Sequence, residues 1–251
     1  MLLAMDIGNT TIALGVLENG ELRFLTRIAT VADHTEADYR PVMEKQLGGW
    51  AEKCGHAVIS SVVSGLTGVL TACVRDLLGV EPLVIRHDLR LGITVGLENP
   101  EKVGADRLAD AAWAAEKYGV PLVTVDLGTA TTINVVDGSR VFRGGVIAAG
   151  VTTGLRALDS RCAALGSVEA QVPASVIGRN TQQAMESGAV YGAAAMIDGL
   201  VQRIREELGS DVRLVLTGGH SSLVSSLVRY PHVQDPQLLL QGLSWLYSRN
   251  R

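Results

Sequence analysis

The sequence predicts an α/β protein built from two related domains. Short apolar runs typical of strands alternate with segments of helical periodicity. An apolar strand, an Asp-x-Gly turn and a second strand occur twice, and a shift of 120 residues carries Asp6 onto Asp126. Because solenoid repeats recur every ~20–50 residues, a copy at this distance indicates two duplicated domains, with mixed sheets flanked by helices.

Composition narrows the class of protein. The chain has 251 residues, of which 47% are hydrophobic and 19% charged, so it can bury a substantial core. The net charge is −4 and no basic block occurs, which disfavours nucleic-acid binding. No run approaches the ~20 apolar residues of a membrane span, and the N-terminus lacks the basic region of a secretory signal. We therefore expect a cytoplasmic protein that does not bind membranes.

The cysteines and histidines do not form a metal motif. The three cysteines, Cys54, Cys73 and Cys162, are far apart and odd in number, which suits buried thiols in a reducing cytosol. No pair of the five histidines has ligand spacing, so a structural zinc site is not expected. We expect His87 and His220 to lie at the surface or in turns.

The first domain is expected to begin with three strands, two of them joined by a turn at Glu18-Asn19-Gly20. Its strands are expected within 2–28 and at 57–62 and 83–85, and its helices at 35–53, 65–78 and 104–118. In the second domain we expect strands at 121–128, 131–137, 140–150 and 214–220, and helices at 181–208 and about 237–249. We place the domains at 1–118 and 119–251, with the last helix packing back on the first domain.

The two Asp-x-Gly turns are the first candidate for chemistry. Gly8 and Gly128 allow close approach of a ligand to the main chain. The residues around them offer hydroxyl, amide and backbone donors that suit phosphate oxygens, namely Asn9, Thr10, Thr11, Thr129, Thr131 and Thr132. One Asp-x-Gly turn alone would be interpreted as an ordinary polar hairpin turn. The repetition favours phosphate binding, and carboxylates at strand ends can orient a hydrated magnesium ion.

The segment Gly104–Arg107 is the second candidate. Asp106 lies at the start of an Ala-rich helix, where the helix dipole favours a carboxylate, so it is either a catalytic base or an ordinary N-cap. Arg107 is either a surface ion-pair partner or a planar fork that recognises a carboxylate. Asp110, one turn further along, is expected to be solvated.

Two segments in the second domain also have alternatives. Gly218 and Gly219, after an apolar strand, form either a nucleotide-binding turn or a plain connection from strand to helix. Gly188 and Gly192 give the 181–208 helix a face of small residues that suits packing within the chain or in a dimer. Thr181 is expected to cap that helix beside Asn180 unless it binds a ligand.

Paired Asp-x-Gly hairpins followed by a strand-Gly-Gly element resemble the ATPase core shared by actin, hexokinase and Hsp70. That resemblance implies ribonuclease H-like (actin-like ATPase) domains with a nucleotide cleft between them. The motifs DIGNT, NPEKVGADR, DLGTATT and SVIGRNT, at 6–10, 99–107, 126–132 and 175–181, make nearly the whole chain similar to type III pantothenate kinases. The resemblance implies ATP-dependent phosphorylation of pantothenate to 4′-phosphopantothenate, the first step of coenzyme A biosynthesis.

The resemblance also implies roles for individual residues. Asp106 is the expected general base, Asp6 the expected contact to Mg²⁺, directly or through water, and Asp126 the expected ligand of a monovalent cation, K⁺ or NH₄⁺. The expected contacts to ATP and its phosphates are Asp6, Gly8, Asn9, Thr10, Thr11, Gly128, Thr129, Ala130, Thr131, Gly218 and Gly219. The expected contacts to pantothenate are Leu97, Gly104, Ala105, Asp106, Arg107 and Thr181, the last from the partner subunit of a homodimer whose acceptor site is near the interface.

Four positions depart from the pattern of these kinases. Leu97, Glu98, Asn134 and Ala149 stand where Tyr, Asp, Asp and Pro are usual. Leu97 removes a hydroxyl and an aromatic wall from the acceptor pocket. Two alternatives therefore stay open: a related kinase with another small hydroxylated acceptor, and a non-catalytic nucleotide-binding regulator of the same fold.

Overall fold

The computed structural model describes residues 1–162 and 166–251. The chain divides into two compact units. Unit 1 is Met1–Trp113 together with Gln237–Arg251, and unit 2 is Ala114–Pro236. The chain therefore passes between the units twice, once inside a helix after Trp113 and once after Pro236.

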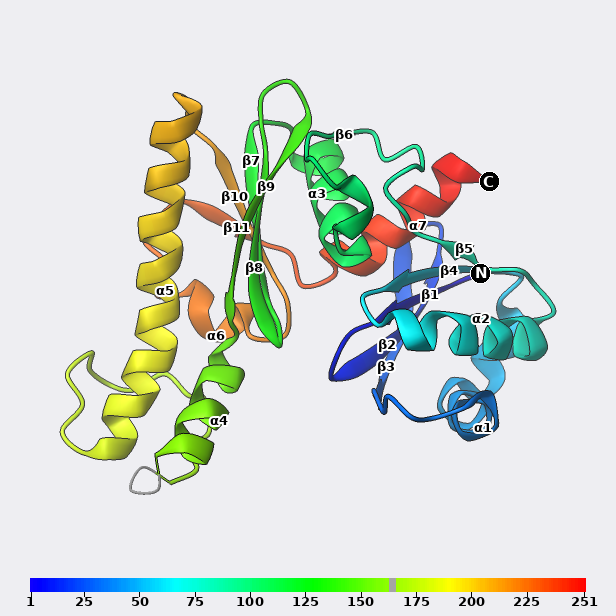
Figure 1. The fold of residues 1–251 in the computed structure, drawn as a ribbon, viewed down its shortest axis with the longest axis horizontal. Coiled ribbons are helices and arrows are strands. Elements are labelled where there is room, and N and C mark those ends of the chain that lie inside the picture. The colour runs from blue at the N-terminus through cyan, green and yellow to red at the C-terminus, as the bar shows by residue number, and fades with distance from the viewer. Residues whose placement is uncertain (163–165) are drawn as a thin grey trace. The chain divides into compact units, whose positions relative to one another are not determined.

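Unit 1 contains a five-stranded mixed sheet (Figure 1). Its elements are, in chain order, β1 (Leu2–Ile7), β2 (Thr11–Glu18), β3 (Glu21–Ala29), α1 (Glu36–Leu47), the 3₁₀ helix η1 (Gly48–Lys53), β4 (His56–Ser61), α2 (Ser64–Leu78), β5 (Leu83–Val84), β6 (Thr94–Val95), the 3₁₀ helix η2 (Pro100–Lys102), most of α3 (Ala105–Tyr118) and α7 (Leu238–Asn250). The strand order is β3-β2-β1-β4-β5, with β1 antiparallel to β2 and parallel to β4.

Unit 2 is built on a sheet of the same design. Its elements are β7 (Leu122–Leu127), β8 (Ala130–Val136), β9 (Val141–Ala149), α4 (Val151–Arg161), α5 (Thr181–Leu208), β10 (Arg213–Thr217), α6 (Ser221–Ser225) and β11 (His232–Gln234). These strands are ordered β9-β8-β7-β10-β11, with β7 antiparallel to β8 and parallel to β10. The matching orders confirm the duplication that the repeated motif predicts.

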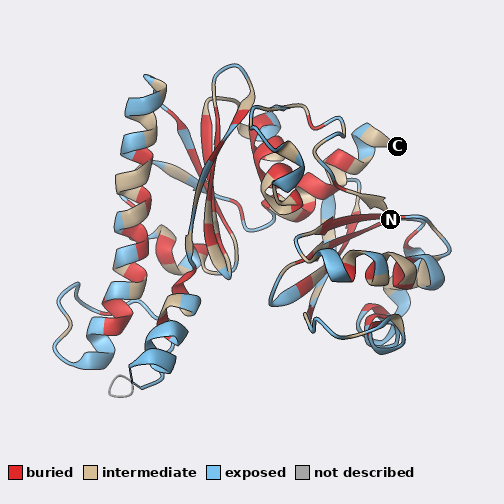
Figure 2. Ribbon diagram, viewed as in Figure 1, coloured by how far each residue is buried: buried red, intermediate tan, exposed pale blue. Residues whose placement is uncertain are grey.

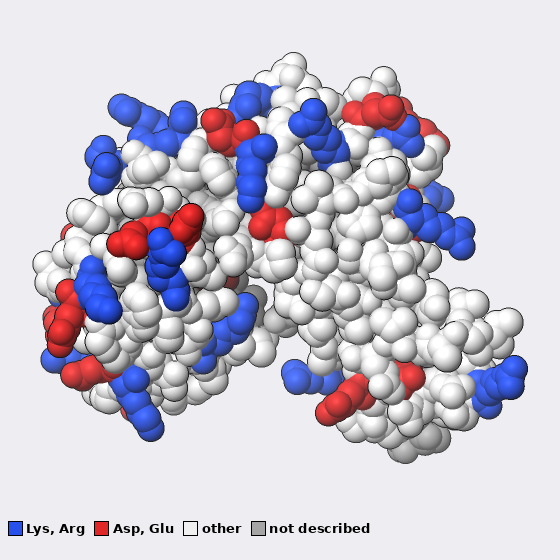
Figure 3. Space-filling view, turned by 180° about the vertical axis from the view of Figure 1, so that it is seen from behind, with Lys and Arg blue, Asp and Glu red and all other residues white. Residues whose placement is uncertain are grey.

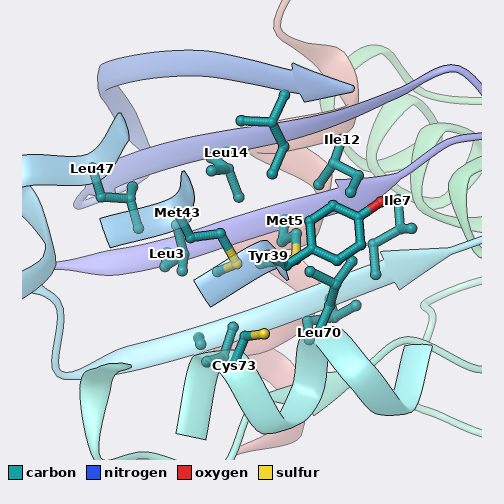
Figure 4. Close-up of a cluster of buried hydrophobic side chains, with 14 of the residues drawn as sticks. Leu3, Met5, Ile7, Ile12, Leu14, Tyr39, Met43, Leu47, Leu70 and Cys73 are labelled. Carbon is teal, nitrogen blue, oxygen red and sulfur yellow. The ribbon is translucent and has the colours of Figure 1, made fainter. Parts of the chain in front are cut away.

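One face of β1 packs on α1 and α2. Leu3 and Met5 are fully buried there against Tyr39 of α1 and Leu70 of α2 (Figure 4). The Tyr39 hydroxyl donates to the carbonyl of Val31 and accepts from its N–H, at 3.1 and 2.8 Å, so the one polar atom of this ring is satisfied. Successive residues of a strand point to opposite faces of the sheet, so Leu2 and Ala4 point away from α1 and α2.

The opposite face of β1 packs on α3 and α7. Leu2 and Ala4 lie in a second buried cluster with Leu108 of α3 and Leu243 of α7. Gly242 allows α7 to approach α3 closely, because a Cβ there would lie 2.8 Å from the carbonyl oxygen of Ala109. Because helices cover both faces, β1 is apolar from Leu2 to Met5, as central strands of such sheets are.

In unit 2 the long helix α5 lies along one face of the sheet (Figure 1). Val190, Ile197 and Val201 of α5 are fully buried in a cluster with Val123 and Val125 of β7. Figure 2 shows the strands of this sheet as largely buried, while much of α5 is exposed. The amphipathic pattern of α5 therefore accounts for its position.

Most predicted elements are confirmed, and the 181–208 helix has the predicted bounds. β6, η2, α4, α6 and β11 were not predicted from the sequence. The first four residues of α4 are Val, Thr, Thr and Gly, all of which are weak helix formers. α6 and β11 are very short. These elements depend on packing rather than on local propensity.

The burial of the cysteines, the character of the helices and the surface charge bear on the expectations from composition. Cys54 and Cys73 are buried as expected, but the expectation was wrong for Cys162, which is exposed immediately after α4. Within the described ranges we find no helix with both the length and the apolar character to cross a lipid bilayer. On the face shown in Figure 3, acidic and basic side chains are intermixed.

We expect Leu70→Ala to destabilise the protein by about 2–5 kcal/mol, because it leaves a cavity in a core where Leu70 is fully buried. The measurement is the free energy of unfolding from urea denaturation. Leu25→Ala, which removes the same atoms from a side chain that is 37% exposed, should cost about 0.5 kcal/mol or less. Equal losses in the two variants would contradict the position assigned to the core.

Candidate functional site

The turn between β1 and β2 is closed by its own hydrogen bonds. The N–H of Gly8 donates to the carbonyl of Thr11 at 3.1 Å, and the hydroxyl of Thr30 donates to the carbonyl of Gly8 at 2.6 Å. A Cβ at Gly8 would lie 3.0 Å from the oxygen of Thr11, so a larger residue crowds the turn. Asn9 and Thr10 are exposed, and their polar groups can reach a ligand in solution.

Asp6 lies at the carboxyl end of β1, next to this turn. In the parallel pairing of β1 with β4, Asp6 is the partner of Ser60, which is fully buried. The Ser60 hydroxyl donates to Oδ1 of Asp6 at 2.8 Å. This bond fixes the orientation of the carboxylate.

Asp106 lies in the first turn of α3, beside the same edge of the unit 1 sheet. Its Oδ1 accepts from the N–H of Arg107 at 2.7 Å. A Cβ on Gly104 would overlap Oδ1 of Asp106 and lie 3.2 Å from Cγ1 of Val62. The N–H of Val62 donates to the carbonyl of Ile7 at the end of β1. Glycine at 104 therefore lets the Asp106 carboxyl lie against the segment that follows β4.

The surroundings of Asp106 alter its acidity. Burial raises the pKa of the Asp106 carboxyl above its ordinary value of 3.8, and the N–H and charge of Arg107 oppose that rise. Burial also lowers the pKa of the Arg107 guanidinium. A carboxyl with a raised pKa at a helix start has the character of a general base, because it binds a proton more readily than an ordinary carboxylate does.

The expectation for Asp110 was wrong. Asp110 is only 1% exposed, not solvated. α3 is buried nearly all round, since Ala109, Ala111 and Ala114 are also fully buried. A short carboxylate on such a helix does not reach water.

In unit 2 the second Asp-x-Gly turn follows β7 and is held by α4. The N–H of Gly128 donates to the carbonyl of Ala130 at 3.0 Å. The hydroxyl of Thr153 and the N–H of Gly150 donate to the carbonyl of Thr129, at 2.6 and 3.1 Å. The turn is therefore fixed by the first residues of α4 as well as by its own strands.

The Gly-Gly segment after β10 packs directly on this turn. Asp126 is the register partner of Thr217 in the parallel pairing of β7 with β10. Gly218 has a φ of +89°, and a Cβ there would overlap Oδ1 of Asp126 and the backbone of Leu127. Only glycine fits both constraints, so Gly218 does more than connect a strand to a helix.

Thr131 carries a buried hydroxyl with no hydrogen-bond partner among the described residues. It lies on β8, opposite Leu127, and is 1% exposed. A buried polar group without a partner is unfavourable, and native proteins keep such groups where a ligand or water satisfies them. The residues of this turn therefore fit the binding of phosphate oxygens.

The other predicted residues lie as follows. Leu97 is half-buried, and Glu98 is exposed. The capping role considered for Thr181 was wrong, because Asn180 is the N-cap of α5 and its side chain accepts from the N–H of Gln183 at 2.9 Å. Asn134 is fully buried, and its amide donates to the hydroxyl of Thr124 on the neighbouring strand β7 at 3.1 Å.

A dedicated protein cage for a metal ion does not occur in the part of the chain that the structure describes, where no three His, Cys, Asp or Glu residues come together. Mg²⁺ in kinases is held through one or two carboxylates together with substrate phosphates. Asp6, fixed by Ser60, fits that kind of site.

Comparison with known proteins identifies the family. The family model described as type III pantothenate kinase matches residues 2–203. The chain belongs to the type III pantothenate kinase family. A relative of that name from Shouchella clausii (strain KSM-K16) is 38% identical over 256 residues, covering 100% of both chains.

Solved structures place this type III pantothenate kinase chain in the actin-like fold. A protein from Campylobacter jejuni described as a Baf family transcriptional activator superposes with a TM-score of 0.64 at 16% identity, covering 98% of this chain and 97% of that one. A ROK family glucokinase from Streptomyces griseus, solved with glucose and AMPPNP, gives 0.51 at 15% identity, covering 98% and 99%. At these identities the likeness shows the fold, which is the predicted one.

Ser60, Thr153 and His220 contact the strands and turns of the candidate site but were not predicted as site residues. Ser60 is the next-to-last residue of β4, the same position that Asp6 occupies in β1. A hydroxyl near the end of another predicted apolar strand was therefore a usable signal. Thr153 and His220 had no such signal, because their contacts depend on α4.

The raised pKa of Asp106 predicts how its charge affects stability. The folded state binds this proton more tightly, so the stability from Asp106 is greatest below the unfolded pKa and is lost as the pH rises through the folded pKa. Asp106→Asn keeps an acceptor for the N–H of Arg107 and removes the charge. We expect its thermal unfolding midpoint at neutral pH to equal or exceed that of the wild type.

Asp38→Asn provides the matched control with the opposite sign. Hydrogen bonds from the N–H and hydroxyl of Thr35 lower the pKa of Asp38, so its stabilisation is present at neutral pH and lost as the pH falls through the folded pKa. This variant should melt at a lower temperature than the wild type. A clear fall in the midpoint of Asp106→Asn would contradict the electrostatics assigned to Asp106.

Proposed function

We propose that this chain transfers the γ-phosphoryl group of ATP to the 4′-hydroxyl of pantothenate, which forms 4′-phosphopantothenate, the first step of coenzyme A biosynthesis. The observation that carries the proposal is membership of the type III pantothenate kinase family, with matches along the whole chain. The chain keeps Asp106 in a setting that suits a base, which favours an active kinase over a non-catalytic regulator.

Asp106 is proposed as the general base. The N–H of Arg107 holds Oδ1, which leaves Oδ2 for the acceptor hydroxyl. As the bond from the hydroxyl oxygen to the γ-phosphorus forms and the bond from that phosphorus to the β,γ-bridging oxygen breaks, the hydroxyl proton passes to Asp106 and ADP leaves. Phosphoryl transfer has a loose transition state, so orienting the hydroxyl and accepting its proton late is sufficient.

The two turns are proposed to bind the nucleotide. Thr10, Thr129 and Thr131 donate to phosphate oxygens, and Gly218 and Gly219 lie beside the adenosine. Mg²⁺ supplies neutralisation of phosphate charge when it is bound, and Asp6 orients it directly or through water. Asp6 suits this role because Ser60 already fixes one of its oxygens.

The acceptor is proposed to bind at the start of α3. The fork of Arg107 recognises the carboxylate of pantothenate, and Gly104 and Ala105 allow the acceptor to approach the helix start. Burial of Arg107 supports this role, since a half-buried guanidinium gains from an anionic ligand. Leu97 offers an apolar wall where related chains offer a phenol, so we expect the affinity for pantothenate to depend on this position.

Asp126 is proposed to hold a monovalent cation, K⁺ or NH₄⁺. The Asp126 carboxylate, packed against the turn at Gly218, offers one negative charge to such an ion. The use of cellular ATP fits a cytoplasmic location.

A coupled assay of ADP release tests the proposed reaction. We expect turnover with pantothenate, ATP, Mg²⁺ and K⁺, and little turnover when Na⁺ replaces K⁺ and NH₄⁺. Asp106→Asn should lower kcat by about 10²–10⁴-fold, the usual contribution of a general base. Asp38→Asn, assayed below its melting temperature, should keep the wild-type rate.

The acceptor is tested with a panel of hydroxy acids and sugars in the same assay. Pantothenate should be the best acceptor. A better acceptor in the panel would replace pantothenate as the proposed substrate. A normal rate in Asp106→Asn would reject Asp106 as the general base.

A homodimer is proposed to form on the groove between α4 and α5. The groove has a volume of about 360 Å³ and is lined by glycine and by residues with apolar side chains. Leu158 lines it and is 41% exposed, and Ile147 and Ile177 elsewhere in unit 2 are 63% and 75% exposed. Apolar surface of this kind is typical of an interface. A second copy on this groove also suits the proposed contribution of Thr181 to the acceptor site of its partner.

Gly192→Glu tests the dimer. A Cβ at Gly192 meets no atom within 4 Å, so the single chain accommodates a side chain, whereas a second copy packed in the groove does not. We expect a dimer for the wild type and a monomer for this variant by light scattering after gel filtration. Gly68→Glu, at an equally open glycine of α2, should stay dimeric. An unchanged dimer in Gly192→Glu would remove the groove from the interface.

A further inference from the structure

The side chain of His220 joins two segments of unit 2 that are far apart in the sequence. Its Nε2 lies 2.8 Å from the hydroxyl oxygen of Thr152, in the first turn of α4. The residue after Thr152, Thr153, donates to the carbonyl of Thr129. Two successive residues of α4 therefore contact the two elements of the proposed nucleotide site, the turn after β7 and the Gly-Gly turn after β10.

The backbone of His220 also closes the Gly-Gly turn. Its N–H donates to the carbonyl of Leu127 at 3.0 Å. The hydroxyl of Ser221 donates to the carbonyl of Gly218 at 2.7 Å. Gly219, between these fixed residues, is exposed, and a Cβ there would meet nothing within 4 Å. The bonds thus hold the turn in one shape and leave its outer surface open to a ligand.

The ring of His220 is not arranged for stability alone. Its Nδ1 is buried and has no hydrogen-bond partner among the described residues. Thr131, whose hydroxyl is also buried and unpartnered there, lies opposite the same Leu127 that accepts from His220. Native proteins keep such buried polar atoms where a ligand or an ordered water satisfies them, which fits a binding site beside Leu127.

We propose that Thr152 and His220 form a positioning pair that holds the Gly218–Gly219 turn in its nucleotide-binding shape. The pair acts on ATP through the turn, and it has no role in binding the acceptor. This inference rests on the proposed kinase function. It gives Thr152 and His220 a role in nucleotide binding that the comparison with the family does not assign.

The pair is tested by steady-state kinetics of the full chain. Thr152→Val keeps the shape of the side chain and removes the hydroxyl. We expect the KM for ATP to rise about five- to tenfold, the usual effect of losing one hydrogen bond, with the KM for pantothenate unchanged. Thr152→Ser, which restores the hydroxyl, should recover the wild-type KM for ATP.

A second chemically similar pair serves as the control. The hydroxyl of Ser225, the last residue of α6, lies 2.8 Å from Nε2 of His232 on β11. Ser225→Ala should leave the KM for ATP unchanged. If Thr152→Val also leaves it unchanged, or raises both KM values equally, the positioning role is overturned.

Direct binding separates this inference from the proposed function. Titration with ATP and Mg²⁺ should show weaker binding to Thr152→Val and His220→Leu, with unfolding midpoints close to the wild type. Wild-type protein that binds ATP but does not phosphorylate pantothenate would reject the proposed reaction, and the ATP titrations of the variants would still decide the role of the pair. If Thr152→Val and His220→Leu are active and bind ATP as tightly as the wild type does, the positioning role of the pair is rejected and the proposed reaction stands.

Discussion

Parallel pairing of one central strand in each unit is the constraint on which the site depends. β1 pairs with β4 and β7 pairs with β10, so the carboxyl ends of paired strands lie at one edge of each sheet. That edge brings Ser60 to Asp6, and it brings Gly218 to Asp126. Because the pairing is shared, a single local design is used twice, with a carboxylate and a glycine turn at the end of an apolar strand.

Asp106 shows how the packing of a helix sets the chemistry of a side chain. α3 is rich in alanine and buried nearly all round, so a carboxyl in its first turn loses hydration. The pKa of Asp106 rises for that reason, so the folded protein disfavours the charged form of this carboxyl. Proteins retain such groups at functional sites, where stability and activity are in conflict.

The sequence predicted what depends on neighbouring residues and missed what depends on distant ones. Hairpins, the Ala-rich helix and the 181–208 helix have local signals, and the repeat of Asp6 at Asp126 indicated the duplication. The bond of Ser60 to Asp6 spans 54 residues, and that of Thr152 to His220 spans 68. The burial of Asp110 depends on elements packed around α3, which no local pattern reveals.

The most direct test of this account is a crystal structure with pantothenate, Mg²⁺ and a non-hydrolysable ATP analogue. The account predicts the acceptor hydroxyl within about 2.6–3.2 Å of a carboxylate oxygen of Asp106. It also predicts phosphate oxygens within hydrogen-bond distance of both glycine turns. A hydroxyl far from Asp106 and bound to another carboxylate would contradict it.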